Sequence, residues 1–386
     1  MDLYGKEVVH RGKKMRIVID CFKQIKGLGK SIGIYNVALN LIKNLVTEKN
    51  RTINPEIRCS ELIVLGNDRN REDFDIDGVN FIVVPKLDPT NKMHCIYWEL
   101  FGVSRMCKKL KADRILFPRG YCGLTHPVYD IVLIHDMIPF YYHEHFPDFF
   151  HKVENAYIMN RLKASAKSAK KVVTISKASK EDIIKYCYID GNKISIIHNA
   201  CNDLDYHEGK CVQANLYLCA ITSNLPHKNA KGLLAGYAEY YQFSTDPLDL
   251  VVIGIEDTSC YEIPDEIRNH IICYKFIKNN RELYRIIGNS KIFLFLSLVE
   301  GFGLPPIEAM QLKVPVICSN TSSLPEVVGK AAILVDPKQP KDIADAINRL
   351  QHDENLQEVL VSEGQKNIER FSWERRAKRY WEVMLE

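Results

Sequence analysis

Short runs of consecutive apolar residues, separated by segments with helical spacing, are the main pattern of this chain. Strands of a parallel sheet have this appearance because helices cover both of their faces. The runs that predict strands are residues 15–20, 62–65, 79–84, 115–118, 130–134, 172–176, 217–221, 250–254, 271–274, 292–296 and 314–318. Helical periodicity follows the first run, fills residues 151–171 and returns at the C-terminus, so the pattern predicts an α/β fold. A chain of 386 residues is too long for one ordinary core, which predicts two domains.

Residues 292–326 contain the clearest unit of this pattern. An apolar run is followed by Glu300-Gly301-Phe302-Gly303, then by Pro305-Pro306 and a helical segment, and then by a second apolar run. Strand, glycine loop, helix and strand make a βαβ unit with the loop at the carboxyl end of its first strand. Open α/β sheets bind their ligands at that edge.

The residues of this loop indicate the chemistry of the ligand. Gly301 and Gly303 permit a close backbone approach, and a helix that starts at Pro305 presents free N–H groups and a favourable dipole to a phosphate. Glu300 and Glu308 would repel a phosphate but suit sugar hydroxyls. The loop therefore predicts a site for a phosphorylated sugar, and a nucleotide sugar fits best.

The segment EGFGLPPIEAM, in which seven residues separate Glu300 from Glu308, resembles the E-x7-E motif of the retaining GT-B glycosyltransferases of family 4. The following VPVICSNTSSLPEVVG is also similar to that family. The resemblance implies two Rossmann-like domains that face each other across a cleft, with a C-terminal helix that returns to the N-terminal domain. We expect an acceptor domain at residues 1–205 and 371–386, and a nucleotide-sugar-binding domain at residues 206–370.

Three residues receive catalytic roles from this resemblance. His135 follows a predicted strand and is expected near the reacting sugar; a core histidine paired with Asp136 is the alternative. Glu300 is expected near the donor sugar. Lys228 lies in Pro226-His227-Lys228-Asn229, which is similar to a Pro-Arg-Lys-Asn turn whose cations hold the donor diphosphate. His227 replaces the arginine and is mostly neutral at pH 7, so Lys228 should carry most of the charge, with Lys30 or Arg119 as helpers.

The same resemblance implies a set of donor contacts, in which Glu308 binds the ribose diol. The residues expected to bind the donor are Gly33, Asn229, Gly301, Phe302, Gly303, Leu304 and Glu308. We expect no metal and no cofactor beyond the nucleotide diphosphate sugar.

Other motifs in the chain are incomplete. Gly29-Lys30-Ser31 imitates a P-loop, but the position that needs a further glycine is Gln24. The irregular spacing from Gly27 to Gly33 disfavours an NAD oxidoreductase. Residues 73–78 imitate the start of a calcium loop and contain a DxD string, which we interpret as an acidic turn before a strand.

Charge is divided unevenly along the chain. Residues 1–200 contain 32 Lys and Arg against 22 Asp and Glu, whereas residues 201–386 contain 20 against 26. A basic N-terminal half suggests an anionic partner, which is a phospholipid surface, a lipid-diphosphate acceptor or a nucleic acid, or else a merely solvated face. We expect a nucleotide sugar, a glycan or lipid-linked acceptor and peripheral contact with an anionic membrane, and no nucleic acid.

Targeting signals and cysteines indicate the compartment. No apolar run reaches the length of a membrane span, and residues 1–11 lack a signal-peptide pattern. The twelve cysteines form no CxxC pair, and several lie within apolar runs, which indicates reduced thiols. A cytoplasmic protein is expected, with the inner face of the membrane as a place of peripheral association.

The leading functional hypothesis is a retaining transfer of a hexosyl group to a hydroxyl in cell-surface polysaccharide synthesis. The resemblance favours GDP-mannose slightly as the donor, although UDP- and dTDP-sugars occur with similar sequences. One alternative is an enzyme of the same fold that acts on a small soluble acceptor. The other is a non-catalytic scaffold that binds a sugar nucleotide, which the lost arginine at position 227 motivates.

Overall fold

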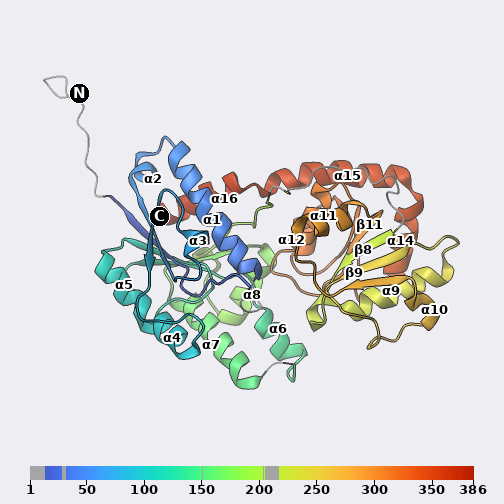
Figure 1. Cartoon of the computed structure of the whole chain (residues 1–386), viewed down its shortest axis with the longest axis horizontal. Coiled ribbons are helices and arrows are strands. Elements are labelled where there is room, and N and C mark those ends of the chain that lie inside the picture. The colour runs from blue at the N-terminus through green and yellow to red at the C-terminus, as the bar shows by residue number, and fades with distance from the viewer. Residues whose placement is uncertain (1–13, 28–31, 150, 203, 205–216) are drawn as a thin grey trace.

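The computed structural model describes residues 14–27, 32–149, 151–202, 204 and 217–386. The chain forms two parallel β-sheets, each flanked by helices, which lie side by side along the long axis of the molecule (Figure 1). Every strand pairing in the described residues is parallel. The predicted α/β fold with two Rossmann-like domains is confirmed.

The N-terminal sheet has the strand order β3-β2-β1-β4-β5-β6-β7. Its strands are β1 (Arg16–Asp20), β2 (Glu61–Gly66), β3 (Val79–Val83), β4 (Arg114–Phe117), β5 (Tyr129–Leu133), β6 (Lys171–Thr174) and β7 (Ile194–Ile196). Its helices are α1 (Ile32–Arg51), α2 (Pro55–Cys59), α3 (Arg71–Phe74), α4 (Lys92–Tyr97), a π-helical turn η1 (Trp98–Gly102), α5 (Val103–Leu110), α6 (Ile138–His145), α7 (Lys152–Ser168), α8 (Lys177–Cys187) and the 3₁₀ turn η2 (Gly191–Lys193). Apolar residues on both faces of the central strands are buried, as expected for a covered parallel sheet.

The C-terminal sheet has the strand order β10-β9-β8-β11-β12-β13. Its strands are β8 (Tyr217–Ile221), β9 (Asp249–Ile253), β10 (Ile271–Tyr274), β11 (Ile292–Phe295), β12 (Val316–Ser319) and β13 (Ala332–Val335). Its helices are the 3₁₀ turn η3 (Pro226–Lys228), α9 (Ala230–Phe243), α10 (Asp265–Arg268), α11 (Asn280–Gly288), α12 (Leu304–Gln311), α13 (Leu324–Val328), α14 (Pro340–His352) and α15 (Glu354–Ile368). Two buried apolar clusters cover the two faces of this sheet.

The end of the chain links the two domains. Helix α15 runs along the C-terminal domain, and after a 3₁₀ turn η4 (Glu369–Phe371) helix α16 (Trp373–Leu385) crosses to the N-terminal domain, where it packs on α1 (Figure 1). Trp381 is fully buried there, and its Nε1 donates a hydrogen bond to the carbonyl oxygen of Leu45 at 3.1 Å. The expected return of the C-terminal helix is confirmed. The expected boundary at residues 205 and 206 lies outside the described residues.

Every apolar run that predicted a strand forms one, within two residues at each end. One feature was not predicted from the sequence. The segment 92–110 is helical, and its pattern did not predict a helix because the π turn at Trp98–Gly102 interrupts the regular spacing. In the C-terminal domain α14 ends at His352, and α15 starts afresh with the Asp353 side chain as its N-cap.

Candidate active site

The glycine loop after β11 leads directly into helix α12, as the sequence predicted. Gly303 has a φ of 106° and precedes the first helical residue, and the prolines occupy the first turn. In the described part of the chain, the backbone N–H groups of residues 301–304 have no hydrogen-bond acceptor. Four free amides at the start of a helix are suited to hold an oxyanion.

Gly301 lies against the N-terminal domain. A Cβ atom at this position would lie 2.7 Å from the carbonyl oxygen of His135 and 3.1 Å from Cβ of Asp136. The Gly301 carbonyl oxygen accepts a hydrogen bond from Ser176 Oγ at 2.8 Å, and Ser179 Oγ lies 3.2 Å away. A glycine is therefore required here because two backbones from different domains touch, which brings the glycine loop after β11 next to the end of β5.

Lys228 and Glu300, both predicted catalytic residues, form an ion pair. Lys228 Nζ lies 2.6 Å from Glu300 Oε1, and both side chains are largely buried. The two residues come from η3 and from the loop after β11, which are 72 positions apart in the chain. The pair places one cation and one carboxylate beside the free amides of the glycine loop.

His227, which stands where the family has arginine, also makes a contact between the domains. Its Nδ1 and the hydroxyl oxygen of Tyr142 in α6 are hydrogen-bonded at 2.7 Å. Burial, and then the neighbouring Lys228, lower the pKa of His227 to about 4. The imidazole is therefore neutral at pH 7, which leaves Lys228 as the charged member of this turn.

Asn229 has a structural part in the same turn. It adopts a left-handed conformation with a φ of 56° and caps α9. Its Nδ2 donates hydrogen bonds to the carbonyl oxygens of Leu296 at 3.0 Å and Pro337 at 2.8 Å. Its Oδ1 accepts from the N–H of Gly232. The side chain thus fixes the loop that carries Lys228, and the donor contact predicted for Asn229 stays a prediction.

His135 and Asp136 lie at the carboxyl end of β5. His135 Nε2 donates a hydrogen bond to the carbonyl oxygen of Pro118 at 2.9 Å, which leaves Nδ1 as an acceptor in the neutral ring. Burial lowers the pKa of His135 to about 4. Burial, and then the nearby Glu300, raise the pKa of Asp136. Asp136 does not bond to His135, so the structural alternative of a His–Asp pair is wrong.

Glu308 lies one turn into α12, in a half-buried position. Burial raises the pKa of its carboxyl group to about 7. No side chain in the described ranges forms an ion pair or hydrogen bond with this carboxylate. A desolvated carboxylate without a partner is suited to accept hydrogen bonds from a ligand's hydroxyl groups.

The other predicted donor residues lie in different surroundings. The side chain of Phe302 is buried and packs edge-on against Phe371, 5.4 Å between ring centroids, so only its backbone is available to a ligand. Leu304 is half-buried at the start of α12. Gly33 is exposed in the first turn of α1. Lys30, which was proposed as a helper of Lys228, lies outside the described residues.

Two residues that form hydrogen bonds with the opposite domain across the cleft were not predicted as site residues from the sequence. Glu326, in α13, accepts a hydrogen bond from the N–H of Lys177 at 2.7 Å through Oε2, and its Oε1 lies 2.7 Å from His198 Nε2. Both partners belong to the N-terminal domain. The Pro325-Glu326 pair was visible in the sequence, but its partners are distant in the chain. Tyr142, the partner of His227, had no signal in the sequence.

An open hollow of about 390 Å³ lies at the carboxyl ends of β8 and β9. It lies between the two domains, and its lining residues are Phe149, Ser223, Asn224, Leu225, Gly254, Glu256 and Lys275. Gly254 has a φ of 114°, and a Cβ there would lie 1.9 Å from the carbonyl oxygen of Thr222, so only glycine fits. The hollow gives a ligand room next to the turn that carries Lys228.

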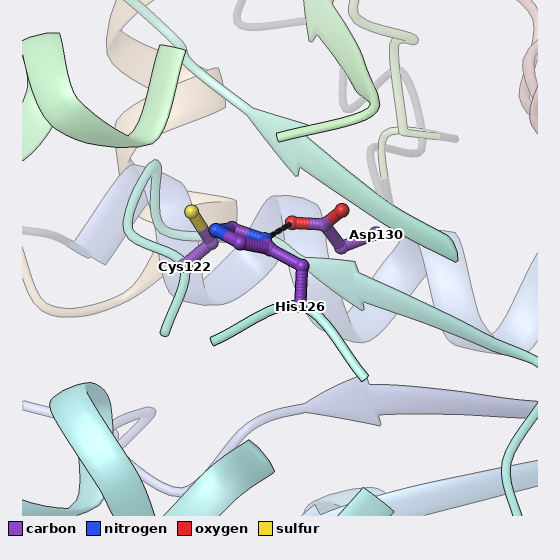
Figure 2. Close-up of side chains that lie close together, drawn as sticks. All are labelled: Cys122, His126 and Asp130. Atoms are coloured by element: carbon purple, nitrogen blue, oxygen red, sulfur yellow. Dashed lines mark hydrogen bonds and ion pairs between the residues drawn. The ribbon is translucent and has the colours of Figure 1, made fainter. Parts of the chain in front are cut away.

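Cys122, His126 and Asp130 form a cluster whose sulfur, nitrogen and oxygen atoms lie within 4.8 Å of one another (Figure 2). The imidazole lies between the thiol and the carboxylate, and His126 Nδ1 is 2.5 Å from Asp130 Oδ2. Asp130 also accepts a hydrogen bond from the N–H of Lys170, and Cys122 Sγ lies 3.5 Å from Ser168 Oγ. These contacts tie the start of β5 to the end of α7, at the edge of the sheet opposite the cleft.

Comparison with known proteins gives the family. Residues 60–203 match the model described as Glycosyltransferase Family 4, and residues 213–367 match the model described as Glycosyl transferases group 1. The O-antigen chain mannosyltransferase RfbU of Salmonella typhimurium is 30% identical over 295 residues, which cover 72% of this chain and 78% of that protein. The chain belongs to the group 1, family 4 glycosyltransferases.

Two further comparisons agree with this assignment. O-antigen chain mannosyltransferase B of Escherichia coli is 30% identical over 243 residues, which cover 59% of this chain and 64% of that protein. The solved structure of HepE from Anabaena, in complex with UDP and glucose, has a TM-score of 0.66 and 14% identity and covers 96% of this chain and 99% of that chain. The structural likeness confirms the GT-B fold.

Proposed function

We propose that the protein transfers a hexosyl group, mannosyl in the preferred form, from a nucleotide diphosphate sugar to a hydroxyl group of a glycan or lipid-linked acceptor. The observation that carries this proposal is the Lys228–Glu300 pair beside the free amides of residues 301–304. Both 30%-identical relatives are O-antigen mannosyltransferases, and HepE has been solved with UDP, which supports the donor class.

The proposed reaction exchanges one bond at the anomeric carbon for another. The bond from this carbon to the diphosphate oxygen breaks, the bond to the acceptor oxygen forms on the same face, and the acceptor proton passes to the leaving phosphate. Negative charge builds on the diphosphate, and Lys228 with the loop amides stabilises it. Glu308 binds the ribose hydroxyls, and His135 Nδ1 accepts a hydrogen bond from the sugar. Attack on the same face retains the anomeric configuration.

The ion pair is expected to open when the donor binds. A diphosphate next to Lys228 competes with Glu300 for the ammonium group, and Glu300 is then free to accept a hydrogen bond from the donor sugar. Asp136 faces the same pair from the opposite domain. The three side chains thus form a charged contact between the donor loop and the acceptor domain.

The neutral His227 favours a second candidate, a scaffold that binds a sugar nucleotide without turnover. Its imidazole has a lowered pKa and is bound to Tyr142, so the charge of the family's arginine is absent. Stereospecific turnover that disappears when Lys228 is replaced would exclude this candidate.

The test of donor binding is thermal melting of the wild type and Glu308→Ala with UDP, GDP, dTDP or CMP in large excess. A ligand at 100 times its Kd stabilises the native state by about 2.7 kcal/mol. We expect a shift with one nucleotide diphosphate that is lost in the variant, and GDP is the preferred candidate. No shift with any of the four nucleotides would contradict the proposal.

A further inference from the structure

An exposed apolar stripe lies on the outer face of the N-terminal domain. We define it by Met93, Tyr97, Phe101 and Leu124, whose exposed fractions are 70%, 42%, 44% and 53%. The first three lie on α4 and the π turn that follows, and α4 and α5 are at the outer end of this domain in Figure 1. Contiguous apolar side chains on a surface mark an interaction site more often than scattered ones do.

The stripe is held in place by contacts along the helix. The rings of Tyr97 and Phe101 lie 6.3 Å apart between centroids. Arg105, one turn further, donates a hydrogen bond to the Tyr97 hydroxyl at 2.7 Å and lies over its ring. Leu124 joins the stripe because its N–H donates to the carbonyl oxygen of Leu100. The π turn keeps these side chains on one face while Trp98 is buried on the other.

Exposed cations lie in the same segment of the chain as the stripe, and Arg105 contacts it directly. Those in residues 86–111 are Lys86, Lys92, Arg105, Lys108, Lys109 and Lys111. None of them forms an ion pair within the described ranges, and the segment contains a single exposed carboxylate, Asp88. An aromatic stripe with a cationic rim is complementary to a bilayer that has anionic headgroups above an apolar interior.

The inner face of the same helix reaches the acceptor side of the cleft. Trp98 Nε1 donates a hydrogen bond to Asp20 at 3.0 Å, and Glu99 pairs with Lys23 at 3.0 Å and Arg161 at 2.8 Å. A small cavity at the carboxyl ends of β1 and β4 is lined by Asp20, Lys23, Glu99, Phe117, Pro118, Arg119 and Tyr121. The carbonyl oxygen of Pro118 is the partner of His135. One helical segment therefore connects the stripe to the surroundings of a predicted catalytic residue.

We propose that the stripe and its cationic rim dock on an anionic lipid bilayer. Docking there brings the acceptor side of the cleft next to the membrane, where a lipid-linked acceptor has its anchor. This orientation rests on the proposed function, whereas the docking itself needs no donor and no turnover. No helix in the described residues is both long and apolar enough to cross a membrane, so the contact is with the surface.

The test is co-sedimentation of the full chain with phosphatidylcholine vesicles that contain or lack phosphatidylglycerol, without nucleotide. We expect binding to the anionic vesicles only, weakened by added salt. Lys108→Glu/Lys109→Glu should lower the partition coefficient by more than about tenfold, and Met93→Ser/Phe101→Ser should lower it similarly. Lys338→Glu/Lys341→Glu, which reverses two exposed charges on the C-terminal domain, keeps the net charge of the first variant and should bind like wild type.

Three results would overturn the proposal. The first is that the wild type does not bind anionic vesicles, and the second is that the C-terminal control variant loses binding equally. The third is a dimer in sedimentation velocity that disappears in Met93→Ser/Phe101→Ser, which would assign the stripe to a second copy of the chain. Nucleotide-induced melting shifts are measured in the same variants, because they report nucleotide binding independently of vesicle binding and so test the proposed function separately. A docking variant that still binds its nucleotide but not vesicles supports the docking surface.

Discussion

Single residues determine the charge at the cleft. Lys228 and Glu300 neutralise one another at 2.6 Å, His227 is neutral because it is buried, and Asp136 has a raised pKa. The charge of Lys228 thus becomes available to a diphosphate once the pair opens. Burial lowers the pKa of His227 and raises that of Asp136, so both groups are less ionised in the cleft than they would be in water.

Lys228→Ala should lower kcat roughly 10²–10³-fold, since the leaving diphosphate loses its cationic partner. Lys231→Ala is the matched control, because Lys231 is exposed on the following helix and should leave kcat unchanged. Initial rates of nucleoside diphosphate release give the comparison. A Lys228→Ala rate equal to that of Lys231→Ala would contradict the assigned role.

Nucleotide affinity should depend on the ionisation of Glu308. The pKa of about 7 in the free protein means that Glu308 must lose a proton before its carboxylate can accept hydrogen bonds from the ribose hydroxyls. The affinity for the nucleotide therefore rises with pH up to about this value and levels off above it. Between pH 6 and pH 7 the ionised fraction rises about fivefold, so we expect a gain in affinity of about fivefold, which calorimetric titration measures. Glu308→Gln removes this part of the pH profile, whereas titration of the nucleotide's own phosphate remains in both proteins. Identical profiles would exclude Glu308 from the site.

The sequence identified residues whose motif is local, and missed those whose partners are distant in the chain. Glu300, Glu308 and Lys228 lie within recognisable loops. Tyr142 and Glu326 act through contacts to the other domain, with His227 and with Lys177 respectively. Such contacts depend on how the two domains meet, which no pattern within one loop encodes.

Elements were predictable where their periodicity was regular. Each predicted strand forms because its run of apolar residues is covered on both faces, but the pattern did not mark Ile194–Ile196 and Ala332–Val335 as strands. These two strands lie at the edges of their sheets, where several of their side chains are incompletely buried. The helices of segment 92–110 were not predicted because the π turn interrupts the helical spacing of apolar residues. The same irregularity produces the exposed stripe.

At the level of elements, the close packing of the loop after β11 against the end of β5 should require a residue without a side chain at position 301. Gly301→Ala places a Cβ 2.7 Å from the carbonyl oxygen of His135, so the loop after β11 and the end of β5 must separate. We expect kcat/KM to fall by up to about 10²-fold because the reacting groups are misplaced. Small-angle scattering should show a larger radius of gyration.

Gly191→Ala is the control for this substitution. Its Cβ would meet only the ends of two flexible side chains, Ile184 Cδ1 at 3.1 Å and Lys180 Cε at 3.5 Å, in the 3₁₀ turn η2. Activity and scattering should match the wild type. If Gly301→Ala behaves like Gly191→Ala, the close approach of the two loops is not required for the reaction.

On the scale of the whole molecule, one buried apolar cluster joins both domains. Phe302 and Ile307 of the C-terminal domain belong to the same cluster as Phe371 and the inner face of α16, which packs on α1. The domains are therefore fastened at one side by α16 and meet through polar contacts in the cleft. This arrangement suits a cleft that opens on the far side while its two halves stay attached.

The return of α16 should stabilise the N-terminal domain. Trp381→Ala removes a fully buried ring and its hydrogen bond to Leu45, which should cost about 3–5 kcal/mol of unfolding free energy. Val359→Ala, at a side chain that is 56% exposed on α15, should change the free energy by less than about 0.5 kcal/mol. Urea denaturation followed by circular dichroism gives both values. Equal stability of the two variants would contradict the packing of α16.

The central claim is that this chain moves a hexosyl group from a nucleotide diphosphate sugar. The most direct measurement uses labelled GDP-, UDP- and dTDP-hexoses with a membrane extract as the acceptor source, and follows transfer of label and release of nucleoside diphosphate. We expect equal amounts of both from one donor, with the donor's anomeric configuration retained in the product and loss of transfer in Lys228→Ala. Binding of a nucleotide without transfer from any of the three donor classes would contradict the account and support the scaffold instead.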